Sequence, residues 1–209
     1  ILEKVDSLSK VKKNPWVDSE LEARFADALK NLSKSPVLNG ARVRVSKDIV
    51  NGKSGYVLEV GDYSYTIEPQ VELAGINGQY PSKPDFVIRS DKDSLNFKPI
   101  AVFLDGYTFH KKIVYEDLLK RQALIRSGEY LVWSLTWHDI NQMFAGSQSK
   151  IPNVMMENTD SAPWQFLKKI EEEKGLSRHH HLAQLSPLHL LVEYLREPDS
   201  DQWRRTILL

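Results

Sequence analysis

Two aspartates mark the ends of two apolar segments that have the composition of neighbouring strands. Asp85 opens segment 85–88 and Asp105 closes segment 100–105, and the eleven residues between the segments are mostly polar, as in a hairpin connection. Antiparallel pairing would place the two carboxylates side by side, because opposed Cβ atoms lie about 4.5 to 5.5 Å apart. Carboxylates at that separation can share one divalent cation. Taken singly, each aspartate also fits a simpler interpretation, a strand boundary at Asp85 and a turn at Asp105-Gly106.

The segment after Asp105 offers further groups for phosphodiester hydrolysis. Gly106 permits a sharp exit from the strand, and His110, Lys111 and Lys112 follow within a few residues. Metal-assisted hydrolysis needs carboxylates for the metal, a cation for the developing charge, and a base or proton donor. We therefore expect His110 and Lys111 to be catalytic. A histidine satisfied at a strand end and a solvated lysine loop are the alternatives.

The helix predicted for residues 115–126 carries one polar side chain on its apolar stripe. The stripe consists of Tyr115, Leu118, Leu119, Gln122 and Ile125. We expect this stripe to face the interior, with Gln122 near its centre. A buried amide needs hydrogen-bond partners, so Gln122 either caps backbone groups or faces the site.

An acidic side chain also stands on the first predicted helix, which begins at Asp18 or Ser19 and ends near Ser35-Pro36. Glu22 follows Ser19 by three residues, the spacing of a capping box, and lies at the edge of the apolar stripe of the helix. It is a third candidate carboxylate.

The remaining pattern predicts the sheet that would position these groups. From residue 42 to 73 short β-type runs are separated by turns at Asn51-Gly52 and Gly61-Asp62. A strand at 130–135 follows the helix at 115–126. The expected fold class is α/β, a mixed sheet flanked by helices.

Composition restricts the class of protein. The chain has 209 residues, 28 basic and 28 acidic residues, 41% hydrophobic residues and no cysteine. This is typical of one globular domain with or without an appendage, and it excludes thiol nucleophiles and cysteine-ligated zinc or iron–sulfur sites. We expect an intracellular, cytoplasmic protein without a membrane span, since no apolar stretch is long enough and the start is too charged for a signal peptide.

Three parts are expected along the chain: a linker at 1–14, a core at 15–145 and a small α-helical C-terminal part at 146–209. Residues 146–150 are polar and contain glycine and serine, and they precede helical patterns at 164–174 and 187–196. Both ends have the character of cut sites, so we expect the chain to be part of a longer protein.

Several segments, in this order, carry a likeness to a known family. They are Ser19-x-x-Glu22-x-x-Phe25, Pro69-Gln70-Val71-Glu72-Leu73, Lys83-Pro84-Asp85-Phe86-Val87-Ile88, the run from Ala101 to His110, the run from Asp117 to Leu124, and Ser127-Gly128-Glu129-Tyr130 followed by the strand with Trp133. Over roughly residues 15 to 140 the chain resembles the PD-(D/E)XK nuclease superfamily, near the very-short-patch-repair endonucleases. The resemblance implies a restriction-endonuclease-like core.

By this resemblance the chain is expected to be a DNA endonuclease or nickase that uses Mg²⁺ or Mn²⁺. Asp85 would be the central metal ligand, Asp105 the second acid and Glu22 a first-helix acid that completes or orients the metal shell. His110 would match the histidine of the loop after the strand. Phe103-Leu104-Asp105 stands where many relatives have Glu-x-Lys or Glu-x-Asp. The lysine's role passes to Lys111, Lys112 or His110, or the site is weakened.

The alternative is a weak or inactive nuclease-fold module that binds DNA or docks within a helicase-like parent, as in antiviral or repair systems. A third class, a protein-interaction scaffold, would have no affinity for DNA. Between residues 83 and 126 nine basic residues stand against six acidic ones. We expect phosphate contacts from Lys112, Arg121, Arg42 and Arg44, although an ordinary solvated face has the same composition.

Overall fold

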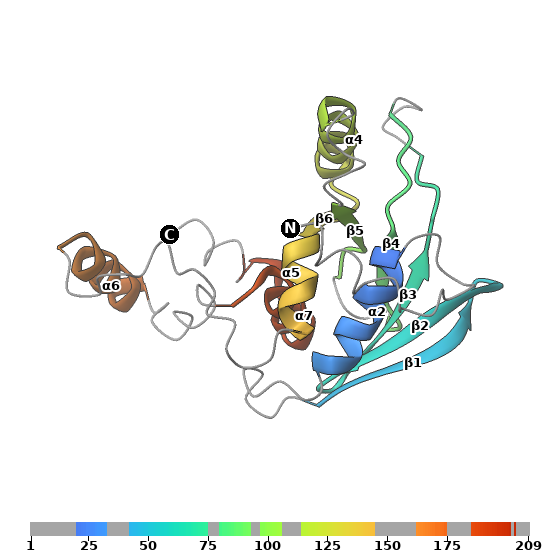
Figure 1. Ribbon diagram of the computed structural model, residues 1–209. Helices are drawn as coiled ribbons and strands as arrows, with labels where there is room; N and C mark the ends of the chain where they lie inside the picture. The colour runs from blue at the N-terminus through green and yellow to red at the C-terminus, as the bar shows by residue number, and fades with distance from the viewer. Residues whose placement is uncertain are drawn as a thin grey trace, which may run out of the picture.

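The computed structural model describes residues 20–32, 42–74, 80–92, 97–105, 114–144, 162–174, 185–201 and 203. Within these residues, six strands form one sheet in the order in which they occur along the chain (Figure 1). The strands are β1 (Val43–Val50), β2 (Lys53–Val60), β3 (Tyr63–Pro69), β4 (Phe86–Ser90), β5 (Ile100–Asp105) and β6 (Leu131–Thr136). Neighbouring strands are antiparallel from β1 to β5, and β5 and β6 are parallel. The expected α/β mixed sheet is confirmed.

Two tight turns set the register of the first three strands. Asn51 and Gly52 both have positive φ, 50° and 76°, which is the geometry of a type I′ turn and leaves Val50 opposite Lys53. Gly61, with φ of 58°, starts the turn between β2 and β3. Both turns stand where the sequence predicts them.

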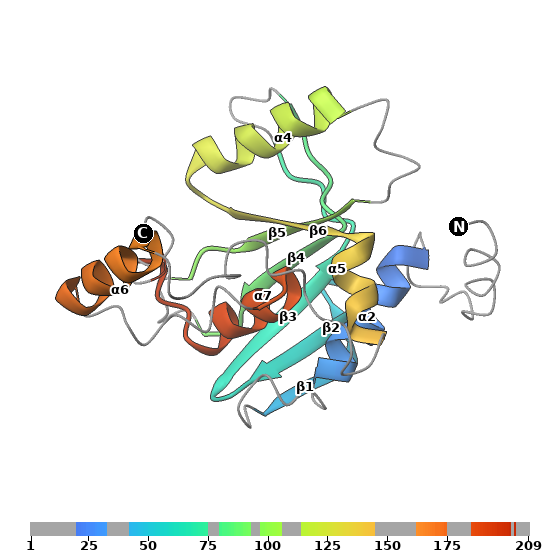
Figure 2. The ribbon, with the colours of Figure 1, turned by 60° about the vertical axis from the view of Figure 1, so that its left-hand side comes forward.

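Helices cover both faces of the sheet (Figure 2). On one face lie α2 (Glu20–Leu32), α5 (Trp137–Asn141) and α7 (Pro187–Arg196), and on the other lies α4 (Val114–Ser127). The parallel pair β5–β6 requires a crossover, and α4 supplies it. Alternate residues of β5 point to opposite faces of the sheet. Val102 and Leu104 pack in the large core with α2 and α7, whereas Ala101 packs with Leu124 of α4.

The last helix is part of the core and is not an appendage. Leu188 and Leu191 of α7 are fully buried, the Tyr65 hydroxyl donates to the carbonyl of Leu195 at 2.6 Å, and the Trp133 indole donates to the carbonyl of Pro187 at 3.1 Å. The expected separation of 146–209 from the core therefore does not hold for α7. An amphipathic helix needs a partner for its apolar stripe, and the open face of the sheet beside α5 supplies one.

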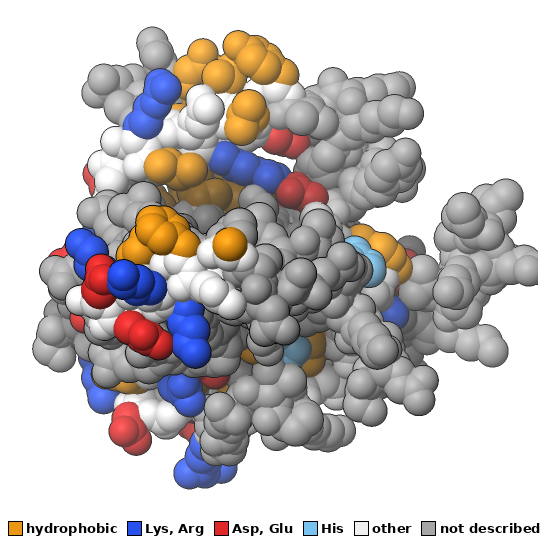
Figure 3. Space-filling view, turned by 90° about the vertical axis from the view of Figure 1, so that its left-hand side faces the viewer, with side chains coloured by type: hydrophobic (Ala, Val, Ile, Leu, Met, Phe, Trp, Pro, Cys, Tyr) orange, Lys and Arg blue, Asp and Glu red, His pale blue; other side chains and the backbone are white. Residues whose placement is uncertain are grey.

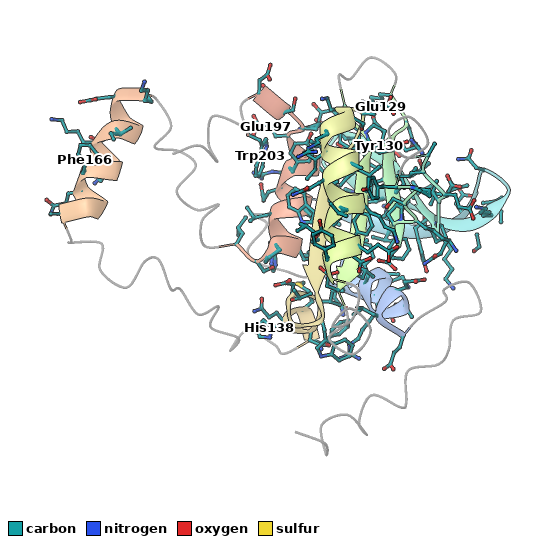
Figure 4. The ribbon with its side chains drawn as sticks, turned by 90° about the horizontal axis from the view of Figure 1, so that it is seen from above. Glu129, Tyr130, His138, Phe166, Glu197 and Trp203 are labelled. Atoms are coloured by element: carbon teal, nitrogen blue, oxygen red, sulfur yellow. The ribbon has the colours of Figure 1, made fainter. Side chains whose placement is uncertain are left out.

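The helix α6 (Ala162–Lys174) lies away from the sheet (Figures 1 and 4). Its Phe166 is 64% exposed. In the described residues, no helix combines the length and apolar character needed to cross a membrane.

The orientation of α4 differs from the expected one. Tyr115, Leu118 and Ile125 are exposed, and so is Gln122, whereas Leu124 is buried. Hydrophobic side chains gather over the upper part of the molecule, where α4 lies (Figure 3). The expected inward stripe is thus the outward one, and Gln122 loses the basis for a catalytic role.

Candidate acidic site

The two aspartates lie at the same end of the sheet but are not directly opposed. The register of β4 and β5 pairs Phe86 with Val102, and one further step sets Asp85 opposite Phe103. The Leu104 amide N–H donates to Oδ2 of Asp85 at 2.7 Å. Asp105 therefore occupies the diagonal position, on the same face of β5 as Phe103. The core fixes this register, because Phe86 and Val102 must both face α2.

Arg121 of α4 holds Asp105 with a two-pronged ion pair. Its Nη1 donates to Asp105 Oδ2 at 2.9 Å, and its Nη2 donates to Oδ1. The same Nη1 donates to the Ser134 hydroxyl on β6 at 2.9 Å. Both partners of the pair are largely shielded, with 18% of the arginine side chain and 27% of the aspartate side chain exposed. Bidentate pairs of this kind are among the stronger polar contacts in proteins.

Phe103 completes the surroundings of the arginine. The guanidinium carbon of Arg121 lies 4.8 Å from the centre of the Phe103 ring, a cation–π contact. The Arg121 Nε is buried and has no hydrogen-bond partner in the part of the chain that the structure describes. Phe103 thus supplies an aromatic platform for a cation beside the two aspartates.

Glu22 is linked to Asp85 through Gln70, for which the sequence predicts no role. The Gln70 side chain donates to Oε1 of Glu22 at 2.7 Å, and the Gln70 backbone N–H donates to the carbonyl of Asp85 at 3.0 Å. Glu22 is 2% exposed. Gln70 has a φ of 53°, which is rare for a residue with a side chain and occurs preferentially at functional positions. The place of Gln70 directly after a strand-ending proline was the signal that could have drawn attention to it.

In the arrangement present, Asp105 is engaged in an ion pair. Both side-chain oxygens of Asp105 accept from Arg121, and the side chain of Phe103 offers no oxygen. Among the described residues, no group of three acidic or histidine side chains has the arrangement of a metal site. A cation ligated by Asp105 would compete with the positive charge of Arg121 for this carboxylate.

The other candidate residues are distributed elsewhere. His110, Lys111 and Lys112 lie outside the described residues. Arg44 pairs with Glu59 at 3.5 Å, and Arg42, which is exposed, precedes β1 at the far edge of the sheet from β5 and β6. The structure therefore links Glu22 to Asp85 through Gln70, places Asp105 diagonally across from Asp85 in an ion pair with Arg121, and leaves Arg42 and Arg44 apart.

Comparison of the chain with protein-family models, with curated proteins and with solved structures finds no match.

Proposed function

We propose that this chain is a nucleic-acid-binding module of a larger, helicase-like protein, with a nuclease-like framework that does not hydrolyse phosphodiesters. One observation carries the proposal. Arg121 occupies both oxygens of Asp105 in a shielded ion pair. The second acid expected for a metal centre is thereby committed within the protein.

Electrostatics favour this interpretation over a resting metal enzyme. A guanidinium within hydrogen-bond distance of Asp105 repels a divalent cation from that position, and the repulsion is strengthened where water is largely excluded. Phe103 stabilises the arginine in place through its ring. Metal binding would have to offset the loss of the bidentate pair and of this contact together.

A nucleic-acid partner is supported by the resemblance over residues 15–140 and by the basic surplus between residues 83 and 126. Arg24, which has no carboxylate partner within the part of the chain that the structure describes, also lies toward this end of the sheet. Phosphate contacts from such side chains bind nucleic acid with little regard to sequence. If the chain binds no nucleic acid, the alternative class, a protein-interaction scaffold, is favoured.

The test combines binding and cleavage on one preparation. Fluorescence anisotropy with labelled DNA should show binding that weakens steeply as salt rises. Supercoiled plasmid incubated with Mg²⁺ or Mn²⁺ should be cleaved no faster than in EDTA, and no faster than by the Asp85→Asn variant. Cleavage by the wild type that Asp85→Asn abolishes would overturn the proposal in favour of a metal-dependent endonuclease. Absence of DNA binding would overturn it in favour of the scaffold.

A further inference from the structure

An arginine on α2 is held between two aromatic rings. The guanidinium carbon of Arg24 lies 5.3 Å from the centre of the Trp137 ring and 4.7 Å from the centre of the Phe144 ring. Its Nε donates to the Asn141 side-chain oxygen at 2.6 Å. The rings come from α5 and from the short helix η4 (Gln142–Phe144), so three elements fix one cation.

This cation has no carboxylate partner among the described residues, and two acids of α5 and α2 are engaged by other groups. Asp139 of α5 accepts from both the backbone and the hydroxyl of Thr136, and Asp27 of α2 pairs with Lys30 at 2.9 Å. The terminal nitrogens of Arg24 are not engaged in any hydrogen bond to the described residues. A positioned guanidinium with unused donors is suited to a phosphate.

An exposed aromatic ring stands beside it. Phe144 is 39% exposed although Arg24 lies over its ring. The exposed His138 belongs to the same short stretch, and Figure 4 places it at the opposite end of the molecule from Glu129 and Tyr130. The amide oxygen of Gln142 is buried there without a partner in the described part of the chain.

The topology places this group at the end of the sheet that carries the acidic site. Thr136, the last residue of β6, pairs in register with Asp105, and Trp137 follows it directly. The acidic site lies on the α4 face and Arg24 on the α2 face, so a strand of nucleic acid that passes around this end of the sheet would meet both.

We propose that Arg24, Trp137, His138 and Phe144, here named the Arg24 surface, bind an unpaired nucleotide of single-stranded nucleic acid. Arg24 binds the phosphate and the exposed ring of Phe144 stacks on the base. Stacking of bases on aromatic side chains next to a basic groove is the common mode for single strands. The inference rests on the proposed function and specifies that its partner is single-stranded.

The experiment measures anisotropy of a labelled single-stranded oligonucleotide and of the matching duplex, at several salt concentrations, with intact chain. Phe144→Leu keeps an apolar side chain and should weaken single-strand binding about tenfold, with a smaller effect on the duplex. Arg24→Gln should weaken it too and reduce the slope of log affinity against log salt by about 0.7. Arg24→Lys keeps the charge and should preserve the slope while losing part of the affinity.

The matched control is Arg126→Gln, which removes an exposed arginine from the last turn of α4, near the other end of β6. It should leave the contrast between single strand and duplex unchanged. Circular dichroism of each variant checks that the fold is retained, and Phe144→Tyr should restore affinity if the ring matters.

Failure of this inference is separable from failure of the proposed function. If the wild type binds nucleic acid and the Arg24 and Phe144 variants bind like it, the Arg24 surface is wrong and the proposed function stands. Equal losses for duplex and single strand would overturn the assignment to unpaired nucleotides. If the wild type binds neither nucleic acid, the proposed function fails and the inference fails with it.

Discussion

The pair Arg121–Asp105 stabilises the fold as well as determining the chemistry of the acidic site. Asp105→Asn removes the carboxylate and leaves Arg121, whose side chain is 18% exposed, without its ion-pair partner. We expect a loss of about 1 to 3 kcal/mol in the free energy of unfolding, measured by denaturant titration. Adding Arg121→Leu to this variant should recover most of the loss, because the unpaired charge is then gone. An Asp105→Asn variant as stable as the wild type would show that the ion pair does not form in solution.

Two buried tyrosine hydroxyls, one with a hydrogen-bond partner and one without a partner in the described part of the chain, should contribute differently to stability. The Tyr65 hydroxyl donates to the Leu195 carbonyl at 2.6 Å, whereas the Tyr194 hydroxyl is buried without a partner among the described residues. Tyr65→Phe should lower the free energy of unfolding by about 0.5 to 1.5 kcal/mol. Tyr194→Phe should cause no loss at neutral pH, because no hydrogen bond is removed. Equal losses in the two variants would contradict this difference.

Which side chains belong to the acidic site could be predicted from residue types, but their contacts could not. Asp85 and Asp105 stand out because acids at the ends of apolar segments are conspicuous, and Glu22 stands out at the edge of the apolar stripe of its helix. The diagonal placement of Asp105 depends on the register of β4 and β5, which buried side chains on α2 and α7 help to fix. The ion pair with Arg121 spans 16 residues and leaves no periodic signal in the sequence.

One leucine in α7 and one in α4 differ strongly in burial, so the same substitution should affect stability differently in the two helices. Leu191 of α7 is 0% exposed and Leu118 of α4 is 48% exposed. Leu191→Ala should lower the free energy of unfolding by about 2 to 5 kcal/mol. The same substitution at Leu118, also within a helix, should change it by no more than about 0.5 kcal/mol. Similar effects at both positions would contradict the placement of α7 in the core.

Element positions were more predictable than element faces. The bounds of β5 and α7 agree with the sequence pattern, because an apolar run and a proline-started helix both carry local signals. The face of α4 was predicted wrongly because its apolar residues favour one side while Arg121 and Leu124 are anchored on the other. Periodicity identifies an apolar stripe and does not identify what covers it.

The free energy of unfolding of the folded chain should fall at alkaline pH. Burial, and to a lesser extent Asp199, raises the pKa of Tyr194 from 10.0 to about 12. The folded state thus favours the neutral phenol, so the stability linked to this group is present below pH 10 and is lost as pH rises towards about 12. Tyr194→Phe should lose less stability across that window, as measured by unfolding at a series of pH values. An unchanged pH dependence would contradict the burial of this hydroxyl.

Binding of Mn²⁺ to the intact chain separates a committed Asp105 from a working metal centre most directly, and electron paramagnetic resonance of the free ion measures it. Because Arg121 occupies Asp105, the wild type should bind no more Mn²⁺ than the Asp85→Asn variant. Arg121→Ala, by freeing Asp105, is the variant in which Mn²⁺ binding should increase. A stoichiometric Mn²⁺ site in the wild type that disappears in both Asp85→Asn and Asp105→Asn would contradict the account and indicate a working metal centre.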